Sequence, residues 1–186
     1  MIERTLVLIK PDGVQRQMVG KLLNIFEESG LKVVGLKLVK PKKENVEKHY
    51  AADEKWMVSV GTKTKASYAE KGVKLDKTEL EIGQEVRNKL LSYLVGKPTV
   101  AIALEGNEAI YAVRKIIGST EPKKADPGSI RGRFGTDSYA KADSEDRAVR
   151  NLVHASEDKE NADREIYIWF DKDELLDYTV ANEPYL

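Results

Sequence analysis

The chain contains 186 residues, 31 of them Lys or Arg and 31 Asp or Glu, so its formal net charge is zero. That length fits one domain with a sizeable core, or one core that carries an insertion. The charge balance argues against a broad basic surface for nucleic acid. The absence of cysteine excludes a disulfide framework, a thiolate metal site and a cysteine nucleophile.

The first part of the chain predicts a strand, a helix and a second strand. Residues 5–9 (TLVLI) form an apolar, β-branched run, which is typical of a central strand. Pro11 and Gly13 follow it and turn the chain. Residues 19–29 have apolar side chains at helical spacing. Residues 34–39 then alternate between apolar and wetter positions, as a strand does.

The middle of the chain predicts helices on either side of a less regular segment. Residues 43–52 form a short, charged helix, in which we interpret His49 as a surface residue. Residues 53–80 have weak apolar periodicity and are interpreted as an excursion from the core. Helical spacing resumes over residues 81–95, and residues 99–104 predict a third strand.

The last part predicts a helix over residues 107–117, a strand over 152–155 and a final helix over 159–170. Residues 118–150 are irregular and contain several Pro and Gly, and long loops of this kind are usually functional. Without the peripheral segments the order is βαββαβ. We therefore expect one α/β (α+β) domain over residues 1–186, a ferredoxin-like core whose four-stranded antiparallel sheet is covered by helices, with a helical excursion and a long active-site loop.

Targeting signals are not apparent in the sequence. The chain begins directly with a strand-like run, without a basic segment followed by a long apolar one, so we expect no secretory signal. The longest uninterrupted apolar run, residues 100–104, is far shorter than the roughly 20 residues that span a bilayer. We expect a cytoplasmic protein with no membrane partner.

Individual residues give only weak signals for chemistry. Neither common glycine-rich phosphate loop is present, and the HRD and DFG segments of protein kinases are also missing. With two histidines and no cysteine, a zinc site is not expected. His154 alone fits a packed histidine at a strand end. Lys10 lies where a strand meets a turn, a common place for a site, whereas Arg114 and Arg131 equally fit ordinary ion pairs.

Taken together, several segments resemble the nucleoside diphosphate kinase family. They run in order over most of the chain: ERTLVLIKPDGVQR at the start, VGKLLNIFEESGLKVVGLK, KHY at 48–50, VRKIIGSTEP at 113–122, PGSIRGRF at 127–134, NLVHASED at 151–158 and ADREIYIWF at 162–170. The opening segment and the segment around His154 are highly specific as a pair.

The resemblance implies a phosphotransferase. Such an enzyme passes the γ-phosphate of a nucleoside triphosphate, mainly ATP, to a nucleoside diphosphate by a ping-pong mechanism, and so supplies the other ribo- and deoxyribonucleoside triphosphates. His154 matches the histidine that becomes phosphorylated. Glu165 matches the carboxylate that orients its ring, and Ser156 the hydroxyl that supports this carboxylate. Lys10 and Tyr50 match the pair that reach the transferring phosphate.

The resemblance also implies a set of nucleotide contacts with broad base tolerance. Arg114, Thr120 and Arg131 match residues that hold the phosphates, together with Lys10, and Asn151 matches the residue that bonds the ribose. The cofactor implied is Mg²⁺, held mainly by the nucleotide phosphates, with Glu157 near its water shell. Alignment forward from KLLSYL places Val86 and Leu90 at the nucleobase positions.

The chain departs from the family pattern at three places. Ala155 follows the histidine where many members have glycine. Residues 53 to about 80 are an insertion that displaces the phenylalanine which stacks on the base, so that Val86 takes its position. Trp56 or Tyr68 in the insertion supplies the stacking instead, or both cover local apolar surface. The loop at residues 135–150 is longer than the family loop.

A second hypothesis is a non-catalytic nucleotide-binding or assembly module that kept the fold. Retention of His154, Lys10, Arg131 and Glu165 argues for the enzyme. By resemblance we expect a homo-oligomer, a hexamer or a tetramer built on a common dimer, and no specific nucleic-acid partner. Residues 178–186 either lie on a neighbouring subunit or fray.

Overall fold

The computed structural model describes residues 1–70 and 72–181. Four strands form one sheet in the order β2-β3-β1-β4, and every neighbouring pair is antiparallel. The sheet confirms the ferredoxin-like arrangement that the order of predicted elements indicated. The strands are β1 (Ile2–Ile9), β2 (Lys32–Val39), β3 (Thr99–Asn107) and β4 (Val153–Ala155).

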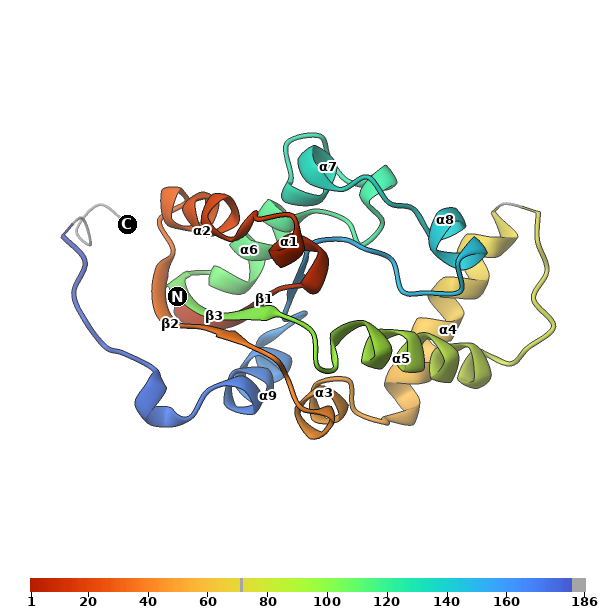
Figure 1. Cartoon of the computed structure of the whole chain (residues 1–186), viewed down its shortest axis with the longest axis horizontal. Helices are drawn as coiled ribbons and strands as arrows, with labels where there is room; N and C mark the ends of the chain where they lie inside the picture. The colour runs from red at the N-terminus through yellow and green to blue at the C-terminus, as the bar shows by residue number, and fades with distance from the viewer. Residues whose placement is uncertain (71, 182–186) are drawn as a thin grey trace.

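Helices cover both faces of the sheet and extend beyond one end of it (Figure 1). In the described residues they are α1 (Pro11–Gln15), α2 (Val19–Glu28), α3 (Lys43–His49), α4 (Glu54–Ala69), α5 (Glu79–Leu94), α6 (Ala109–Ile117), α7 (Ile130–Phe134), α8 (Tyr139–Ser144) and α9 (Lys159–Trp169), with single 3₁₀ turns at Pro122–Lys124 and Lys172–Glu174.

Alternation along β1 divides the core into two layers. Val7 and Ile9 face α2 and α6, whereas Leu6 and Leu8 face α3, α5 and α9. All four side chains are fully buried. A strand that is apolar on both faces can occupy only the interior of the sheet, and β1 does lie between β3 and β4. The end of β1, where Lys10 follows, is thereby fixed in the centre of the molecule.

The prediction of a less regular segment over residues 53–80 is wrong for its first part, because Glu54–Ala69 form the regular helix α4. Asp53 caps it by accepting a hydrogen bond from the Trp56 amide at 2.7 Å. Two glycines bring α4 and α5 together: a Cβ on Gly61 would lie 1.8 Å from the Glu79 carbonyl oxygen, and one on Gly83 would lie 2.0 Å from that of Met57. The helices therefore touch backbone to backbone, a contact that leaves no apolar periodicity in the sequence.

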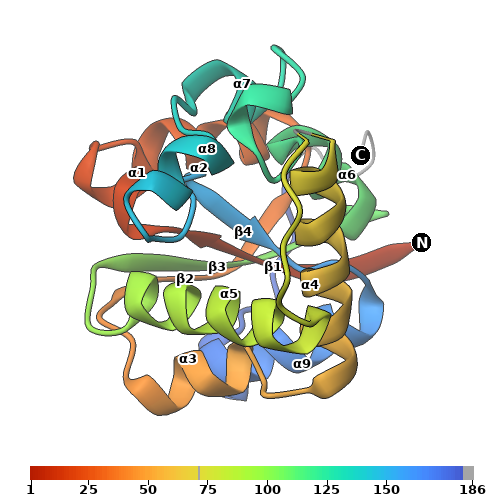
Figure 2. The same cartoon turned by 90° about the vertical axis from the view of Figure 1, so that its right-hand side faces the viewer.

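Residues 118–150, predicted to be irregular, also contain short helices. Ser129 caps α7 and Ser138 caps α8 through hydrogen bonds to backbone amides. Buried Asp137 holds the segment together, since its carboxylate accepts hydrogen bonds from the Arg147 guanidinium at 2.5 and 3.1 Å and from the Arg150 amide at 2.7 Å. Figure 1 shows α8 and α4 at the same end of the molecule, beyond the sheet, and in Figure 2 they lie on either side of β4.

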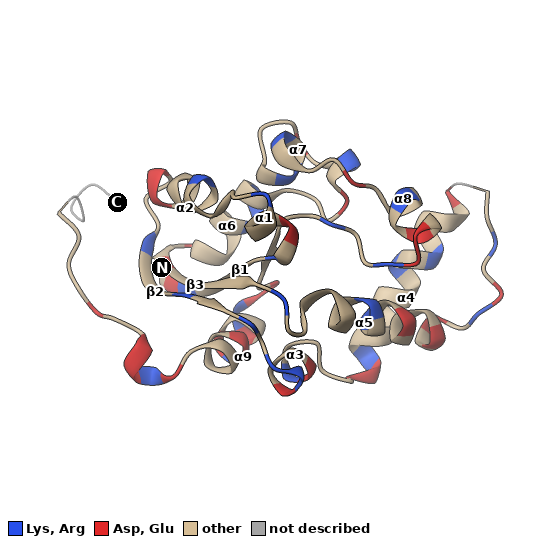
Figure 3. Ribbon diagram, viewed as in Figure 1, with Lys and Arg blue, Asp and Glu red and all other residues tan. Residues whose placement is uncertain are grey.

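Charged residues of both signs are mixed along the helices rather than segregated (Figure 3). None of the helices within residues 1–70 and 72–181 combines the length and the hydropathy needed to cross a membrane. Near the C-terminus, the Leu176 amide donates to the Val34 carbonyl at 2.7 Å, and the Tyr178 hydroxyl to that of Val33 at 2.7 Å. The last five residues of the predicted tail, 182–186, lie outside the described residues.

Candidate active site

His154 lies at the centre of β4, which pairs with the end of β1. Its Nε2 is 3.0 Å from Oε2 of Glu165 on α9, and the Ser156 hydroxyl donates to the same oxygen at 2.7 Å. Glu165 and Ser156 are buried, whereas the side chain of His154 keeps 20% of its surface exposed. The structure thus joins three predicted residues in one hydrogen-bonded group, with only the histidine open to the outside.

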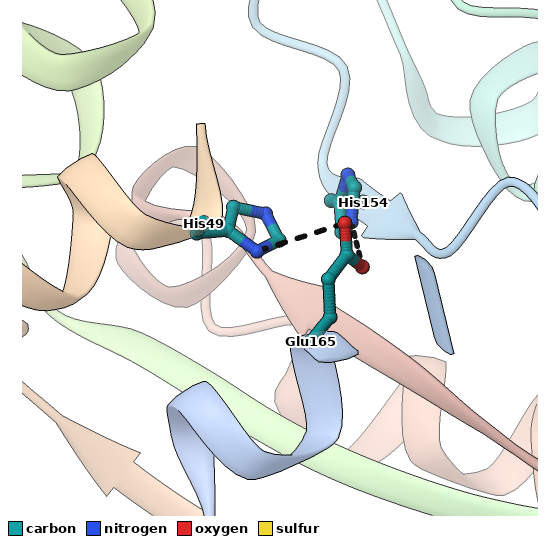
Figure 4. A group of neighbouring side chains, drawn as sticks. All are labelled: His49, His154 and Glu165. Carbon is teal, nitrogen blue, oxygen red and sulfur yellow. Dashed lines mark hydrogen bonds and ion pairs between the residues drawn. The ribbon is translucent and has the colours of Figure 1, made fainter. Parts of the chain in front are cut away.

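The charge of Glu165 determines which nitrogen of His154 is free. Burial acts against the ionised carboxylate, but His154, His49 and the Ser156 hydroxyl stabilise it and lower its pKa to about 2. An ionised carboxylate only accepts hydrogen bonds, so the neutral imidazole must carry its proton on Nε2. Figure 4 shows the other nitrogen, Nδ1, directed away from Glu165. Its lone pair is therefore available as a nucleophile.

Lys10 immediately follows β1 and is buried. Its Nζ donates to Oδ1 of Asn151 at 2.7 Å, and the amide of Asn151 donates to the Thr120 carbonyl at 2.8 Å. Burial, followed by repulsion from the Arg131 guanidinium, lowers the pKa of Lys10 to about 7, although Asp12 acts in the opposite direction. An anion bound nearby would therefore strongly stabilise the charged form of Lys10.

Arg131 on α7 is buried and links three stretches of backbone. Its nitrogens donate to the carbonyls of Gly118 at 2.7 Å, Val153 at 2.8 Å and Asn151 at 3.4 Å. Burial lowers its pKa to about 10, so it stays charged at neutral pH. A guanidinium has five N–H groups, which leaves donors on the terminal nitrogens for a further acceptor. Arg131 therefore holds these backbone segments together and also places a positive charge near His154.

The backbone before β4 is unusual at Leu152, whose φ is 69°. Its amide donates to Oδ2 of Asp12 at 3.1 Å, and its carbonyl accepts from the Lys10 amide at 2.8 Å. A bulky side chain rarely adopts this left-handed conformation, and here it is fully buried. The turn ties Asn151 and His154 to the end of β1.

A cavity of about 460 Å³ opens in front of His154. One side is formed by α4 and α5, and the opposite side by residues 114–120, α7, α8 and the turn before β4. A second hollow of about 750 Å³, on the far side of α5, holds none of the predicted site residues. The predicted residues that line the first cavity are Lys10, Tyr50, Val86, Leu90, Arg114, Thr120, Arg131, Asn151, His154 and Glu157.

Residues of the predicted insertion complete this cavity. Trp56, Lys63 and Tyr68 on α4 all line it, so both aromatic candidates for base contact reach the site. Lys63 Nζ lies 3.9 Å from a carboxylate oxygen of Glu157 across the mouth, although both side chains are largely exposed. Lys63 could not be predicted as a site residue, because it comes from a segment without family resemblance.

His49 is buried, so its interpretation as a surface residue is wrong. The ring centroids of His49 and His154 are 4.5 Å apart and their planes meet at 80°. The charged neighbours Glu47 and Lys48 suggested exposure, whereas the spacing of Val46, His49 and Tyr50 (i, i+3, i+4) was the signal for a buried helix face. All three of those side chains are in fact buried.

Comparison with known proteins decides the family. A family model described as "Nucleoside diphosphate kinase" matches residues 3–59 and 79–175. The chain belongs to the nucleoside diphosphate kinase family. A curated nucleoside diphosphate kinase from Pyrobaculum aerophilum is 41% identical over 181 residues, which cover 95% of this chain and 99% of the relative. One from Synechococcus elongatus is 37% identical over 185 residues, covering 100% and 99%.

Solved structures of this family have the same fold. That of an NDP kinase from Pyrobaculum aerophilum gives a TM-score of 0.90 at 39% identity and covers 95% of this chain and 100% of its own. A transition-state mimic of the Borrelia burgdorferi nucleoside diphosphate kinase, with bound vanadate and ADP, gives 0.81 at 32% identity, covering 99% and 96%.

As a member of the nucleoside diphosphate kinase family, the protein is a phosphotransferase. The family model leaves residues 60–78 unmatched, which lie inside the predicted insertion at 53–80. The unmatched residues include most of α4 and the whole connection to α5. The wall of the cavity that carries Lys63 and Tyr68 is therefore additional to the family pattern.

Proposed function

We propose that the protein transfers the γ-phosphoryl group of a nucleoside triphosphate, mainly ATP, to nucleoside diphosphates through a phosphohistidine on His154. The observation that carries this proposal is the free Nδ1 of His154, which faces a cavity lined by Lys10, Arg114 and Arg131 while Glu165 holds Nε2 from behind. A nucleophile, its orienting group and cations for a polyphosphate are all present in one place.

The chemistry at His154 follows from its tautomer. The Nδ1 lone pair attacks the γ-phosphorus, an N–P bond forms, and the bond from phosphorus to the bridging oxygen breaks so that the diphosphate leaves with the electron pair. The imidazole becomes positive during attack, and the ionised Glu165 stabilises it through Nε2–H. The second half-reaction reverses these steps with a different diphosphate, which gives ping-pong kinetics.

The remaining residues act by positioning and by neutralising charge, which dominate in phosphoryl transfer. Lys10 and Tyr50 reach the transferring phosphoryl group, and Arg114, Thr120 and Arg131 hold the other phosphates. Asn151 bonds the ribose, and Val86 and Leu90 border the base. Since few of these contacts read the base, we propose broad use of purine and pyrimidine nucleotides.

Mg²⁺ would enter this site bound to the nucleotide phosphates and not in a site made by protein ligands alone. The one three-residue cluster of possible metal ligands found within residues 1–70 and 72–181 is His49, His154 and Glu165, whose two imidazoles are poor ligands for a hard cation. Glu157 is an exposed carboxylate at the cavity mouth, suited to contact the metal's water shell. When bound with the nucleotide beside Glu157, Mg²⁺ would offset the negative charge of the phosphates.

The test is formation of the phosphohistidine. Incubation with γ-labelled ATP and Mg²⁺ should place an acid-labile phosphate on His154, which any nucleoside diphosphate then discharges. His154→Ala should abolish labelling while nucleotide binding remains. Folded wild-type protein that binds ATP but takes up no label would refute catalysis and favour the alternative, a nucleotide-binding or assembly module.

We also propose that the chain forms a homo-oligomer in the cytoplasm, a hexamer or a tetramer built on a common dimer. Support comes from β2, which is an edge strand with Leu36 and Leu38 exposed at 50% and 67%. Exposed apolar edge strands tend to pair with another chain. The mass of the protein in solution, measured for wild type and Leu38→Lys, tests both the assembly and this edge.

A further inference from the structure

Behind the catalytic histidine lies a second histidine that the proposed function does not use. His49, the last residue of α3, is 3% exposed and does not line the cavity. It therefore cannot touch a substrate held there. It does contact both members of the catalytic pair, His154 through the rings and Glu165 at 3.8 Å from Nδ1 to Oε1.

The tautomer of His49 is fixed by Trp169. The Trp169 indole Nε1 lies 3.3 Å from His49 Nδ1, and an indole N–H can only donate. Nδ1 must therefore be the acceptor, which places the proton of His49 on Nε2. This Nε2 is buried and has no hydrogen-bond partner among the described residues. A polar group left unpaired in a core is costly, and an apolar side chain would fill the same space without that cost.

The position of the ring indicates what it does at this place. Figure 4 shows His49 directed at His154 and Glu165, with the two imidazole rings nearly perpendicular. Perpendicular aromatic packing at this distance is favourable and restricts rotation of both rings. Tyr50 and Trp169 pack on His49 from other sides, with ring centroids 4.6 and 5.7 Å away. The His49 ring is thus held in place by its neighbours and can restrict rotation of the His154 ring.

His49 is neutral at physiological pH, which also suits a position beside His154 and Glu165. Burial, followed by the positive charge that His154 can carry, lowers the pKa of His49 to about 3. A neutral His49 does not compete with His154 for the carboxylate of Glu165. It also adds no repulsion when His154 becomes positive during attack.

We propose that His49 is a positioning residue for phosphoryl transfer: its ring holds the His154 imidazole with Nδ1 facing the cavity and keeps water from the rear of Glu165. The inference rests on the proposed function. It differs from a purely structural role because it predicts a loss in the rate of attack, not in nucleotide binding or in the fraction of active protein.

The experiment is single-turnover phosphorylation by excess ATP and Mg²⁺, which gives a rate and a final amplitude. His49→Leu should reach the wild-type amplitude at a rate at least about tenfold lower, because small misplacements of reacting groups have effects of this size. Nucleotide affinity should stay within about twofold, since His49 lies outside the cavity. Val46→Ala, on the same helix and buried in the same layer, controls for lost packing and should keep the wild-type rate.

Two further variants guard against a folding defect. His49→Phe restores a flat ring and should be at least about threefold faster than His49→Leu, as expected for a positioning contact. Trp169→Phe leaves His49 in place but releases its Nδ1, and should be at least about threefold slower than wild type. A wild-type rate in His49→Leu or in Trp169→Phe would overturn the inference, as would equal losses in His49→Phe and His49→Leu. Absence of phosphohistidine in the wild type would instead refute the proposed function.

Discussion

Nucleotide binding should draw a proton onto Lys10. In the free protein, the pKa of this buried lysine is about 7. About 0.9 of the molecules therefore carry a neutral Lys10 at pH 8, and only about 0.1 at pH 6. A polyphosphate within a few Å stabilises the ammonium and raises its pKa again. Binding should then take up about 0.9 proton at pH 8 and about 0.1 at pH 6 through Lys10 alone.

Isothermal titration calorimetry measures this uptake when binding enthalpies are compared in buffers with different ionisation enthalpies. A β,γ-methylene analogue of ATP with excess Mg²⁺ avoids phosphoryl transfer. Titration of the analogue itself cancels in the difference between wild type and Lys10→Met. Lys40→Met, an exposed lysine at the end of β2, should behave like wild type. Uptake that does not change with pH, or that persists in Lys10→Met, would refute the assignment of a neutral, buried lysine.

The remaining predictions concern two separate buried carboxylates, Glu165 and Asp137, and the base end of the cavity. Glu165→Ala should lower the rate of transfer about 10²-fold without abolishing it, because the carboxylate orients and stabilises but does not attack. Single-turnover labelling beside His154→Ala checks this, and equal losses in both variants would contradict the assigned roles. Asp137→Asn should lower the free energy of unfolding at pH 7 by about 1–3 kcal/mol, since it weakens hydrogen bonds to a buried carboxylate. Burial acts to raise the pKa of Asp137, but its contacts with Arg147 and the Arg150 amide together hold it below its ordinary value. The contribution is therefore present above that ordinary value and lost as pH falls through the lowered pKa, so urea unfolding should show wild type and variant converging in acid. Val86→Phe should tighten ADP binding by about 1–3 kcal/mol through stacking on the base and leave tripolyphosphate binding unchanged. An unchanged ADP affinity would place the base elsewhere in the cavity.

The sheet and the hydrogen-bonded group around His154 could be predicted because their signals are local. The run from Leu6 to Ile9 is apolar on both faces and allows only a central strand, which fixes where Lys10 must lie. His154, Ser156 and Glu165 lie within a short stretch of sequence, so the resemblance carried them together. Their mutual contacts follow from the pairing of β4 with β1 and from the buried face of α9, which carries Glu165.

Other features depend on contacts that leave no local pattern. The close approach of α4 and α5 rests on Gly61 and Gly83, and glycines contribute nothing to apolar periodicity. Helices as short as α7 and α8 contain too few residues for a periodic pattern to appear. The burial of His49 requires Trp169, which lies 120 residues further along the chain. The charged residues beside His49 in the sequence suggested that it is exposed, although its spacing from Val46 and Tyr50 indicated a buried helix face.

The left-handed Leu152 has a consequence for folding. Nothing in the local sequence favours this conformation for a bulky side chain. Its amide and carbonyl find their partners at Asp12 and Lys10, which become fixed only when β1 is in place. We therefore expect the turn that presents Asn151 and His154 to form after β1 has joined the sheet. A partly folded chain with β1 to β3 and their helices already ordered would lack catalytic geometry, so recovery of activity during refolding should lag behind recovery of secondary structure.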